Sequence, residues 1–132
     1  MKENKQNFTP DTHYFEADPT NHEKGYIVFQ YGSKTLNLGY EPEGDIINVA
    51  TLIYTDDSLE KKDDETTFLY NTAKQFMQKL AHETQKIIVY CLTTENAKMI
   101  LWAKTKGRNL FQWTKEELPS HGPAKFTVTF KN

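Results

Sequence analysis

The fold is decided by the stretch from residue 46 to residue 92, which reads IINVATLIYTDDSLEKKDDETTFLYNTAKQFMQKLAHETQKIIVYCL. The apolar run at 46–54 predicts a strand, and the shorter run at 87–92 predicts a second, buried strand. Between them, apolar residues recur at spacings of three and four, which predicts a helix over 66–83. The members of this apolar stripe are Leu69, Ala73, Phe76, Met77 and Leu80. A crossover of this kind is right-handed and places its two strands parallel.

Two further strands precede this unit. Residues 26–31 form a β-branched and aromatic run, and Leu36, Leu38 and Tyr40 alternate with polar residues. The Gly32–Ser33 break between the two runs favours a tight hairpin. Pro42, Gly44 and Asp45 predict the next turn, so these strands and 46–54 form a three-stranded antiparallel meander. Because 46–54 is continuously apolar, we expect it to be covered on both faces.

A second helix is predicted over 95–106, with Thr93 or Thr94 as its cap and Gly107 as its stop. Strands are predicted at 109–113 and 125–130, joined by a turn that contains Pro119, Gly122 and Pro123. The fold class is therefore α+β. The third strand of the meander begins a β-α-β-α-β-β series around a mixed central sheet. We expect residues 25–132 to form a single domain, and residues 1–24 a flexible N-terminal arm with a short edge strand at 13–16.

The composition narrows the classes of function. The 16 basic and 18 acidic residues give a net charge of -2, which argues against a general phosphate-backbone binder. The single cysteine, Cys91, excludes an internal disulfide and fits a reducing compartment. The first residues lack an apolar segment, and no apolar run approaches the roughly 20 residues of a membrane span. We therefore expect a cytoplasmic protein that does not enter the membrane.

Residues 94–107 read TENAKMILWAKTKG, and with the order of elements they resemble the second half of the GCN5-related N-acetyltransferase (GNAT) fold. In that family an Asn follows a strand, an apolar helix with an aromatic residue comes next, and a Lys-x-Gly-Phe-like turn closes it. Asn96, Trp102 and Gly107 fall close to those places, although Trp102 is one position early and Arg108 replaces the aromatic residue. The likeness covers about residues 26–130 and lacks the usual N-terminal helices.

The resemblance implies an acyl-CoA site between two splayed strands. Backbone amides of the third strand and of the following helix would bind the coenzyme, with Asn96 ordering the strand end and the two lysines adding positive charge. The positions implied for coenzyme binding are Ile53, Tyr54, Thr55, Lys61, Lys62, Thr66, Thr67 and Asn96. Tyr90 would be the acid that reprotonates the departing thiolate, and Cys91 a nucleophile or proton carrier. The commoner explanation for both Tyr90 and Cys91 is that they are packing residues.

The loop that should hold the coenzyme pyrophosphate departs from the family. That loop is glycine-rich in the family, because its backbone must approach the phosphates at a helix N-terminus. Here residues 59–67 read LEKKDDETT, without a glycine and with three consecutive acids, Asp63, Asp64 and Glu65. Like charges about 4 Å apart near a surface repel by roughly 4 kcal/mol, which opposes phosphate binding. We therefore expect weak or absent acyl-CoA-dependent N-acyltransferase activity and doubt that acetyl-CoA binds tightly.

Two other classes of function stay open. The first is a non-enzymatic protein-interaction module that uses the acidic loop 56–65 or the Trp102/Trp113 region. The second is single-strand nucleic-acid binding through the basic residues near those tryptophans, which we expect less because cations there also complement a helix C-terminus. These cations are Lys98, Lys104, Lys106 and Arg108. The histidines are dispersed without the spacing of a zinc site, so we expect no metal. The partner would be an amine substrate or an unknown protein, and the sequence leaves the oligomeric state open.

Overall fold

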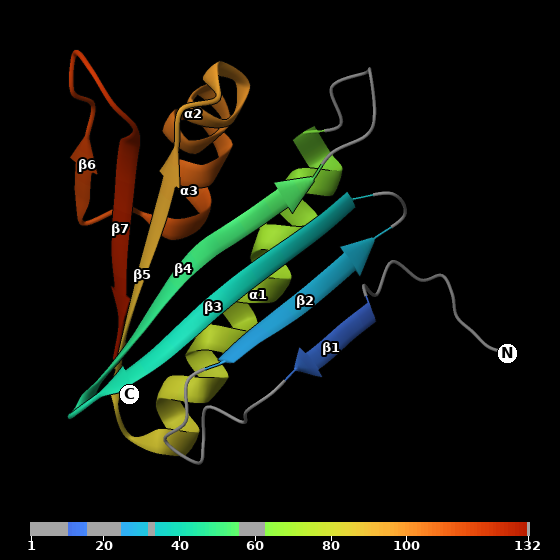
Figure 1. Cartoon of the computed structure of the whole chain (residues 1–132), viewed down its shortest axis with the longest axis vertical. Coiled ribbons are helices and arrows are strands. Elements are labelled where there is room, and N and C mark those ends of the chain that lie inside the picture. Colours follow the sequence, from blue (N-terminus) through green and yellow to red (C-terminus); the bar gives the residue numbers. More distant parts are fainter. Residues whose placement is uncertain (1–10, 16–24, 32–33, 56–62, 132) are drawn as a thin grey trace, which may run out of the picture.

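A computed structural model describes residues 11–15, 25–31, 34–55 and 63–131. Its elements are β1 (Asp11–Phe15), β2 (Gly25–Tyr31), β3 (Lys34–Glu43), β4 (Ile46–Thr55), α1 (Asp63–Thr84), β5 (Ile87–Thr94), α2 (Ala97–Lys104), α3 (Lys106–Phe111), β6 (Lys115–Glu117) and β7 (Ala124–Phe130). The strands form one sheet in the order β1-β2-β3-β4-β5-β7-β6 (Figure 1). Among the strands of the described residues, only the β4–β5 pair is parallel. The predicted α+β class with a mixed sheet is confirmed.

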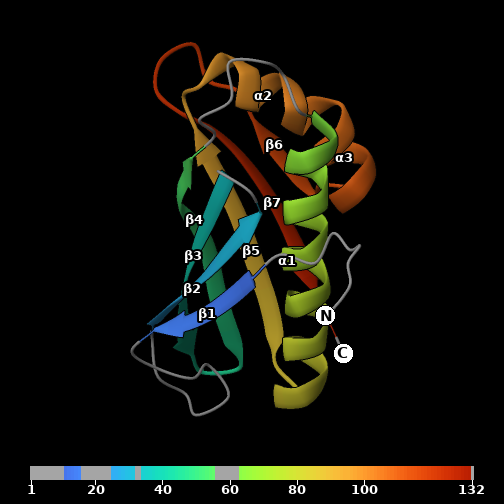
Figure 2. The same cartoon turned by 90° about the vertical axis from the view of Figure 1, so that its right-hand side faces the viewer.

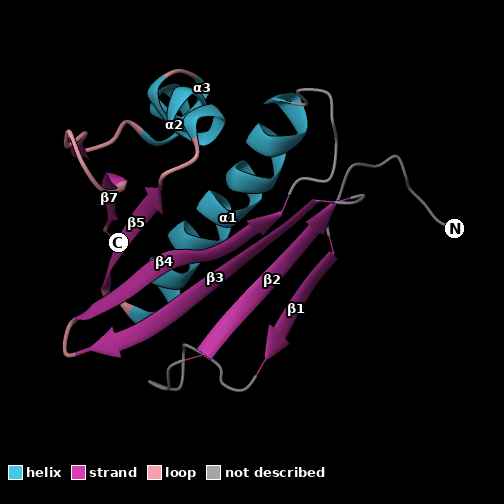
Figure 3. Cartoon of the chain, turned by 45° about the horizontal axis from the view of Figure 1, so that its top comes forward, coloured by secondary structure: helices cyan, strands magenta, loops and turns pink. Residues whose placement is uncertain are grey.

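The predicted antiparallel meander is present as β2, β3 and β4. The β2–β3 pairing extends to Tyr31 opposite Lys34, and the predicted break at Gly32–Ser33 lies outside the described residues. The β3–β4 hairpin closes with Glu43 opposite Ile46. Gly44 has a φ of 64° in that turn, a conformation that favours glycine over residues with a Cβ. Figure 3 shows the long strands of the meander lying across α1.

The three helices of the described residues lie on one face of the sheet, as Figure 2 shows. We call this the covered face, and the opposite one the open face. Successive strand residues point to opposite faces, so Leu36, Leu38 and Ile47 are buried against the helices. On the open face of β4, Ile46 is 36% and Leu52 57% exposed. The expectation that this strand is covered on both faces was therefore wrong: one layer of helices covers one face only.

Helix α1 confirms the predicted amphipathic segment. Leu69, Ala73, Met77 and Leu80 are buried, as their spacing predicts. The helix begins at Asp63, three residues before the predicted start, so the consecutive acids lie in its first turn, as expected from their preference for a helix N-terminus. It ends at Thr84, after which Gln85 takes a positive φ of 57° and donates its N–H to the Ala81 carbonyl at 2.9 Å.

The segment after β5 corrects two predictions. The second helix ends at Lys104, and Gly107 does not stop it but lies buried inside α3. Residues 109–113 were wrongly predicted as a strand, because a short apolar run cannot be assigned by periodicity alone. Thr105 interrupts the helical path with φ -115° and ψ -90°, and the chain then turns helical again. The three-residue strand β6, Lys-Glu-Glu, carries no apolar alternation and was not predicted.

The N-terminal edge strand pairs antiparallel with β2, from Asp11 opposite Gln30 to Phe15 opposite Tyr26. It starts two residues before the predicted segment 13–16. Residues 1–10 and 16–24, the rest of the predicted arm, lie outside the described residues. Within the described ranges, no helix combines the length and the apolar character that crossing a membrane requires.

Candidate functional site

The parallel strands β4 and β5 separate towards their C-terminal ends. They pair from Ile46 opposite Ile87 to Ala50 opposite Cys91. Beyond those residues β4 continues to Thr55 and β5 to Thr94, and no further β4–β5 pair occurs between the described residues. Figure 1 shows the two ribbons diverging from this point. We call the unpaired ends, residues 51–55 and 92–94, the fork.

A β-bulge bends the β4 arm of the fork. The β3–β4 register passes from Asn37 opposite Ile53 to Leu38 opposite Thr51, so Leu52 is the extra residue. A bulge twists its strand and disrupts the hydrogen-bond ladder locally. The predicted binding residues Ile53, Tyr54 and Thr55 lie just beyond it, and each pairs with β3. The other edge of this arm faces the fork, so the alternate backbone groups of residues 51–55 that point there have no β5 partner.

On the covered side, a side-chain contact closes the base of the fork. Tyr90 of β5 is fully buried, and its hydroxyl contacts the Thr51 hydroxyl of β4. The Tyr90 ring packs 5.5 Å from Phe111 and 6.3 Å from Trp113, between ring centroids. Burial raises the pKa of Tyr90 well above its ordinary value, and the hydrogen bond with Thr51 opposes that rise. The phenol is therefore protonated at neutral pH and is a weaker acid than an exposed tyrosine.

Cys91 lies on the other side of the strand. It follows Tyr90 directly, so the two side chains point to opposite faces, and Cys91 is only partly buried on the open face. Its Sγ lies 3.5 Å from the Thr93 hydroxyl. The structure therefore separates the two residues predicted as catalytic. Tyr90 lies beneath the fork among aromatic rings, and Cys91 lies at the last paired position before the fork opens.

The residues predicted at the helix start already have structural partners. Because α1 begins at Asp63, the Thr67 amide falls within the helical ladder, four residues further on. The Thr67 hydroxyl accepts a hydrogen bond from Trp102 Nε1 at 3.0 Å. Thr66 is buried, with 6% of its surface exposed. The backbone N–H groups of α1 that lack a partner within the helix are therefore those of its first turn, which contains the consecutive acids.

A buried amine that sequence reasoning missed lies at this end of α1. Lys34 Nζ is 3.3 Å from Glu65 Oε1, and the Lys34 side chain is only 2% exposed. The alternation of β3 gave a signal for it, because Lys34 is in phase with Leu36 and Leu38 on the covered face. Glu65 thus lies at the positive end of the helix dipole and pairs with a buried cation.

Asn96 caps α2, whereas the sequence predicted Thr93 or Thr94 as the cap; both threonines lie within β5. Its Oδ1 accepts hydrogen bonds from the backbone N–H groups of Lys98 at 2.9 Å and Met99 at 3.1 Å, which caps α2. Its own backbone N–H donates to the Thr94 hydroxyl at 3.0 Å. The Asn96 side-chain oxygen is therefore used in fixing the strand-to-helix turn. The other polar residues predicted there, Lys61 and Lys62, lie outside the described residues.

The two tryptophans belong to the core rather than to a free surface. Trp102 is 4% exposed, and its ring centroid lies 4.7 Å from that of Tyr70. Trp113 is partly buried, stacks on Phe111 at 4.7 Å, and donates Nε1 to the Ala103 carbonyl at 2.9 Å. Neither ring is laid out as an exposed platform for stacking a base.

The fold and the fork define a mixed α+β domain with one parallel strand pair that opens at its C-terminal end. No family model matches the chain, and no curated protein matches its sequence. Among solved structures, one similar chain is described as a "putative acetyltransferase" from Sphaerobacter thermophilus DSM 20745. It is 9% identical, with 89% of this chain and 75% of that chain covered, at a TM-score of 0.45. A TM-score below 0.5 shows neither the family nor the activity of this chain.

Proposed function

We propose that the chain is an acetyltransferase-like domain whose fork holds an acyl-CoA thioester, and that its degenerate pyrophosphate loop makes binding weak and acyl transfer to an amine slow. The observation that carries this proposal is the parallel β4–β5 pair, which ends at Ala50 opposite Cys91 although both strands continue. Backbone groups at the open strand edges can bind an extended, amide-containing chain as another strand would.

The fold suits the thioester end of the coenzyme better than its pyrophosphate. The fork offers backbone N–H groups that suit the amides and the thioester carbonyl. The start of α1 suits the pyrophosphate poorly, because its first three residues are Asp63, Asp64 and Glu65. A like charge at about 4 Å opposes binding by about 1 kcal/mol in water and by about 4 kcal/mol near a protein surface. The favourable N–H groups of the fork and the repulsion at the start of α1 together predict weak binding.

When bound, the coenzyme supplies an activated acyl thioester. The amine nitrogen of the acceptor forms a bond to the acyl carbon, the carbon–sulfur bond breaks, the amine loses a proton and the sulfur gains one. The amides of the β4 arm are suited to stabilise the carbonyl oxygen as charge develops on it. In this proposal Tyr90 passes a proton to the sulfur through the half-buried Thr51 hydroxyl that it contacts, and the proton lost by the amine restores the phenol. Cys91 then lines the approach from the open face.

Calorimetry tests binding directly. Acetyl-CoA and desulfo-CoA are titrated into the protein at millimolar concentration, and both are expected to bind weakly. The double variant Asp63→Asn/Asp64→Asn leaves the Glu65–Lys34 pair intact and should tighten binding about tenfold, since relief of about 1.4 kcal/mol corresponds to that factor. The control, Glu41→Gln/Glu83→Gln, removes the same charge elsewhere and should leave affinity nearly unchanged. No heat from either ligand, in wild type or variant, would remove the enzyme proposal.

The rival function is a protein-interaction module that uses the acidic loop 56–65. The observation in its favour is the buried Lys34, whose ion pair with Glu65 holds part of this acidic segment in place. A lysine-rich peptide is the probe. If the peptide binds and Asp63→Asn/Asp64→Asn weakens it while coenzyme binding stays absent, the rival is supported. If the same variant gains coenzyme binding and its affinity for the peptide does not change, the transferase-like domain is supported.

A further inference from the structure

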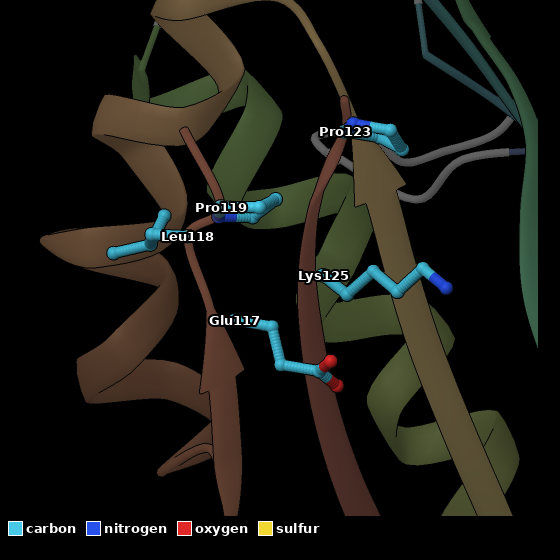
Figure 4. Close-up of a pocket in the computed structure, with 5 residues that line it drawn as sticks. All are labelled: Glu117, Leu118, Pro119, Pro123 and Lys125. Atoms are coloured by element: carbon cyan, nitrogen blue, oxygen red, sulfur yellow. The ribbon is translucent and has the colours of Figure 1, made fainter. Parts of the chain in front are cut away.

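A pocket separate from the fork lies where β6 and β7 are joined. It has a volume of about 460 Å³ and is lined by Glu117, Leu118, Pro119, Pro123 and Lys125. Figure 4 shows its walls, with the two prolines at one end and the charged side chains extending from β6 and β7. The pocket is therefore framed by one short connection and two paired strands.

The charged pocket residues lie on the open face of the sheet. Glu117 and Lys125 are direct partners in the β6–β7 ladder. Because Ala124 and Phe126 are buried on the covered face, Lys125 points to the open face, and so does its partner Glu117. Lys125 is also opposite Thr93, at the β5 arm of the fork. The pocket therefore shares a face with the fork and is separated from it by β7 and β5.

The opposite charges in the pocket do not neutralise each other. The Lys125 side chain makes no hydrogen bond or ion pair with the described residues. Figure 4 shows its ammonium group extending over β5, away from the Glu117 carboxylate. Glu117 pairs with Lys115 at 3.6 Å, and both side chains are well exposed. Such exposed pairs contribute only about 0–1 kcal/mol, so a ligand ammonium group can replace Lys115.

Two features restrict the movement of the pocket walls. Proline fixes its own φ, and Pro119 and Pro123 flank the connection between the strands. On the covered face, Arg108 fastens β6 to α3 by donating from Nε and Nη2 to the two Glu116 oxygens, at 2.9 and 2.7 Å. A preformed pocket loses little conformational freedom when a ligand enters.

We propose that this pocket binds a small zwitterion with an apolar body, such as an amino acid with an aliphatic side chain. Its ammonium group pairs with Glu117, its carboxylate with Lys125, and its apolar part contacts Pro119 and Pro123. A simple cation is opposed by Lys115 and Lys125, and a simple anion is opposed by Glu117. A ligand with both charges is therefore favoured over one with either alone. This inference needs no coenzyme and does not rest on the proposed acyl transfer.

The test compares three probes of similar shape, followed by amide chemical shifts in NMR titrations without coenzyme. Leucine carries both charges, leucinamide lacks the carboxylate, and 4-methylpentanoate lacks the ammonium group. We expect leucine to shift the amides of residues 115–125 and to bind about tenfold more tightly than the other two, as the loss of about 1.4 kcal/mol predicts. Lys125→Met should remove the preference over leucinamide, and Glu117→Gln the preference over 4-methylpentanoate.

The control is Lys131→Met, which removes a cation just beyond the end of β7 and should leave the leucine affinity unchanged. Spectra of all variants that match the wild type outside residues 115–125 establish that the fold is retained. Equal shifts from the three probes, or no shift with leucine at tens of millimolar, would overturn the proposal. A failure of coenzyme binding at the fork would leave these results unaffected.

Discussion

Gly107→Ala should destabilise the domain although glycine within a helix is normally unfavourable. Gly107 is buried in α3 beneath the Trp102 ring. A Cβ at this position would lie 2.8 Å from Trp102 Cζ3, 3.0 Å from Cε3 and 3.2 Å from Cη2. Carbon atoms normally approach to about 3.5–4.0 Å, so the ring would have to move by about 0.7 Å.

The ring has little freedom to make that movement. Trp102 donates Nε1 to Thr67 at 3.0 Å and lies against Tyr70 with 4.7 Å between ring centroids. Overpacking of this kind costs about 1–3 kcal/mol, and a weakened hydrogen bond costs about 1 kcal/mol. The higher helix propensity of alanine offsets about 1 kcal/mol of this cost. The net loss in the free energy of unfolding is about 1–3 kcal/mol, which lowers Tm by about 3–12 °C for a domain of this size.

Urea unfolding followed by circular dichroism measures this loss, with Asn109→Ala as a control on an exposed position of the same helix. The decisive comparison is a double-mutant cycle with Trp102→Phe, which removes the ring atoms that the new methyl group meets. In that background Gly107→Ala should cost less than about 0.5 kcal/mol or become stabilising. An unchanged cost in the Trp102→Phe background, or a wild-type-like single variant, would refute the packing argument.

Three further changes have definite expected outcomes. Tyr90→Phe should lower the free energy of unfolding by about 1 kcal/mol, and adding Thr51→Val should cost less than the two single losses combined, because both remove one hydrogen bond; additive losses in urea would contradict this. Asn96→Ala should cost about 1 kcal/mol through the lost α2 cap, whereas Asn96→Asp retains most of it; equal stabilities of the two variants would count against the cap. Hydrogen bonding from Arg108 lowers the pKa of Glu116, so their pair stabilises the fold above the unfolded carboxyl pKa of about 4.3 and loses this effect as the pH falls through the lowered folded value. Glu116→Gln should therefore lower Tm at neutral pH and leave it unchanged well below the folded pKa, and the same difference at both pH values would exclude the pair as the cause.

The sequence predicted the parts of the fold that periodicity controls. Alternation located the meander strands, and the spacing of three and four located α1. Burial of a single face requires apolar residues at regular intervals along the sequence. The strand–helix–strand order then predicted the parallel pairing of β4 with β5. The cap of α2 was predicted at Thr93 or Thr94 but is Asn96, because several consecutive polar residues precede this helix and composition does not distinguish among them.

Other features depend on contacts between distant parts of the chain. The buried Gly107 is explained by its packing against Trp102, and Phe111 by its ring contacts with Tyr70 and Tyr90, which periodicity does not record. The bulge at Leu52 follows from the register against β3, and a one-residue insertion changes no local pattern strongly. The separation of Tyr90 from Cys91 was available from strand alternation alone, since neighbouring residues of a strand point to opposite faces.

Gly39 shows that two equally close contacts can have different consequences. A Cβ on Gly39 would lie 2.9 Å from Leu52 Cδ1, almost the distance found between Gly107 and Trp102. Leu52, however, is 57% exposed at the bulge, and its side-chain end can rotate into solvent, whereas Trp102 is 4% exposed. We therefore expect Gly39→Ala to change the free energy of unfolding by less than about 1 kcal/mol in the same urea assay, because an exposed side chain relieves the contact at little cost. A loss as large as that of Gly107→Ala would mean that Leu52 is held rigidly and that the bulge of the fork depends on the absence of a side chain at residue 39.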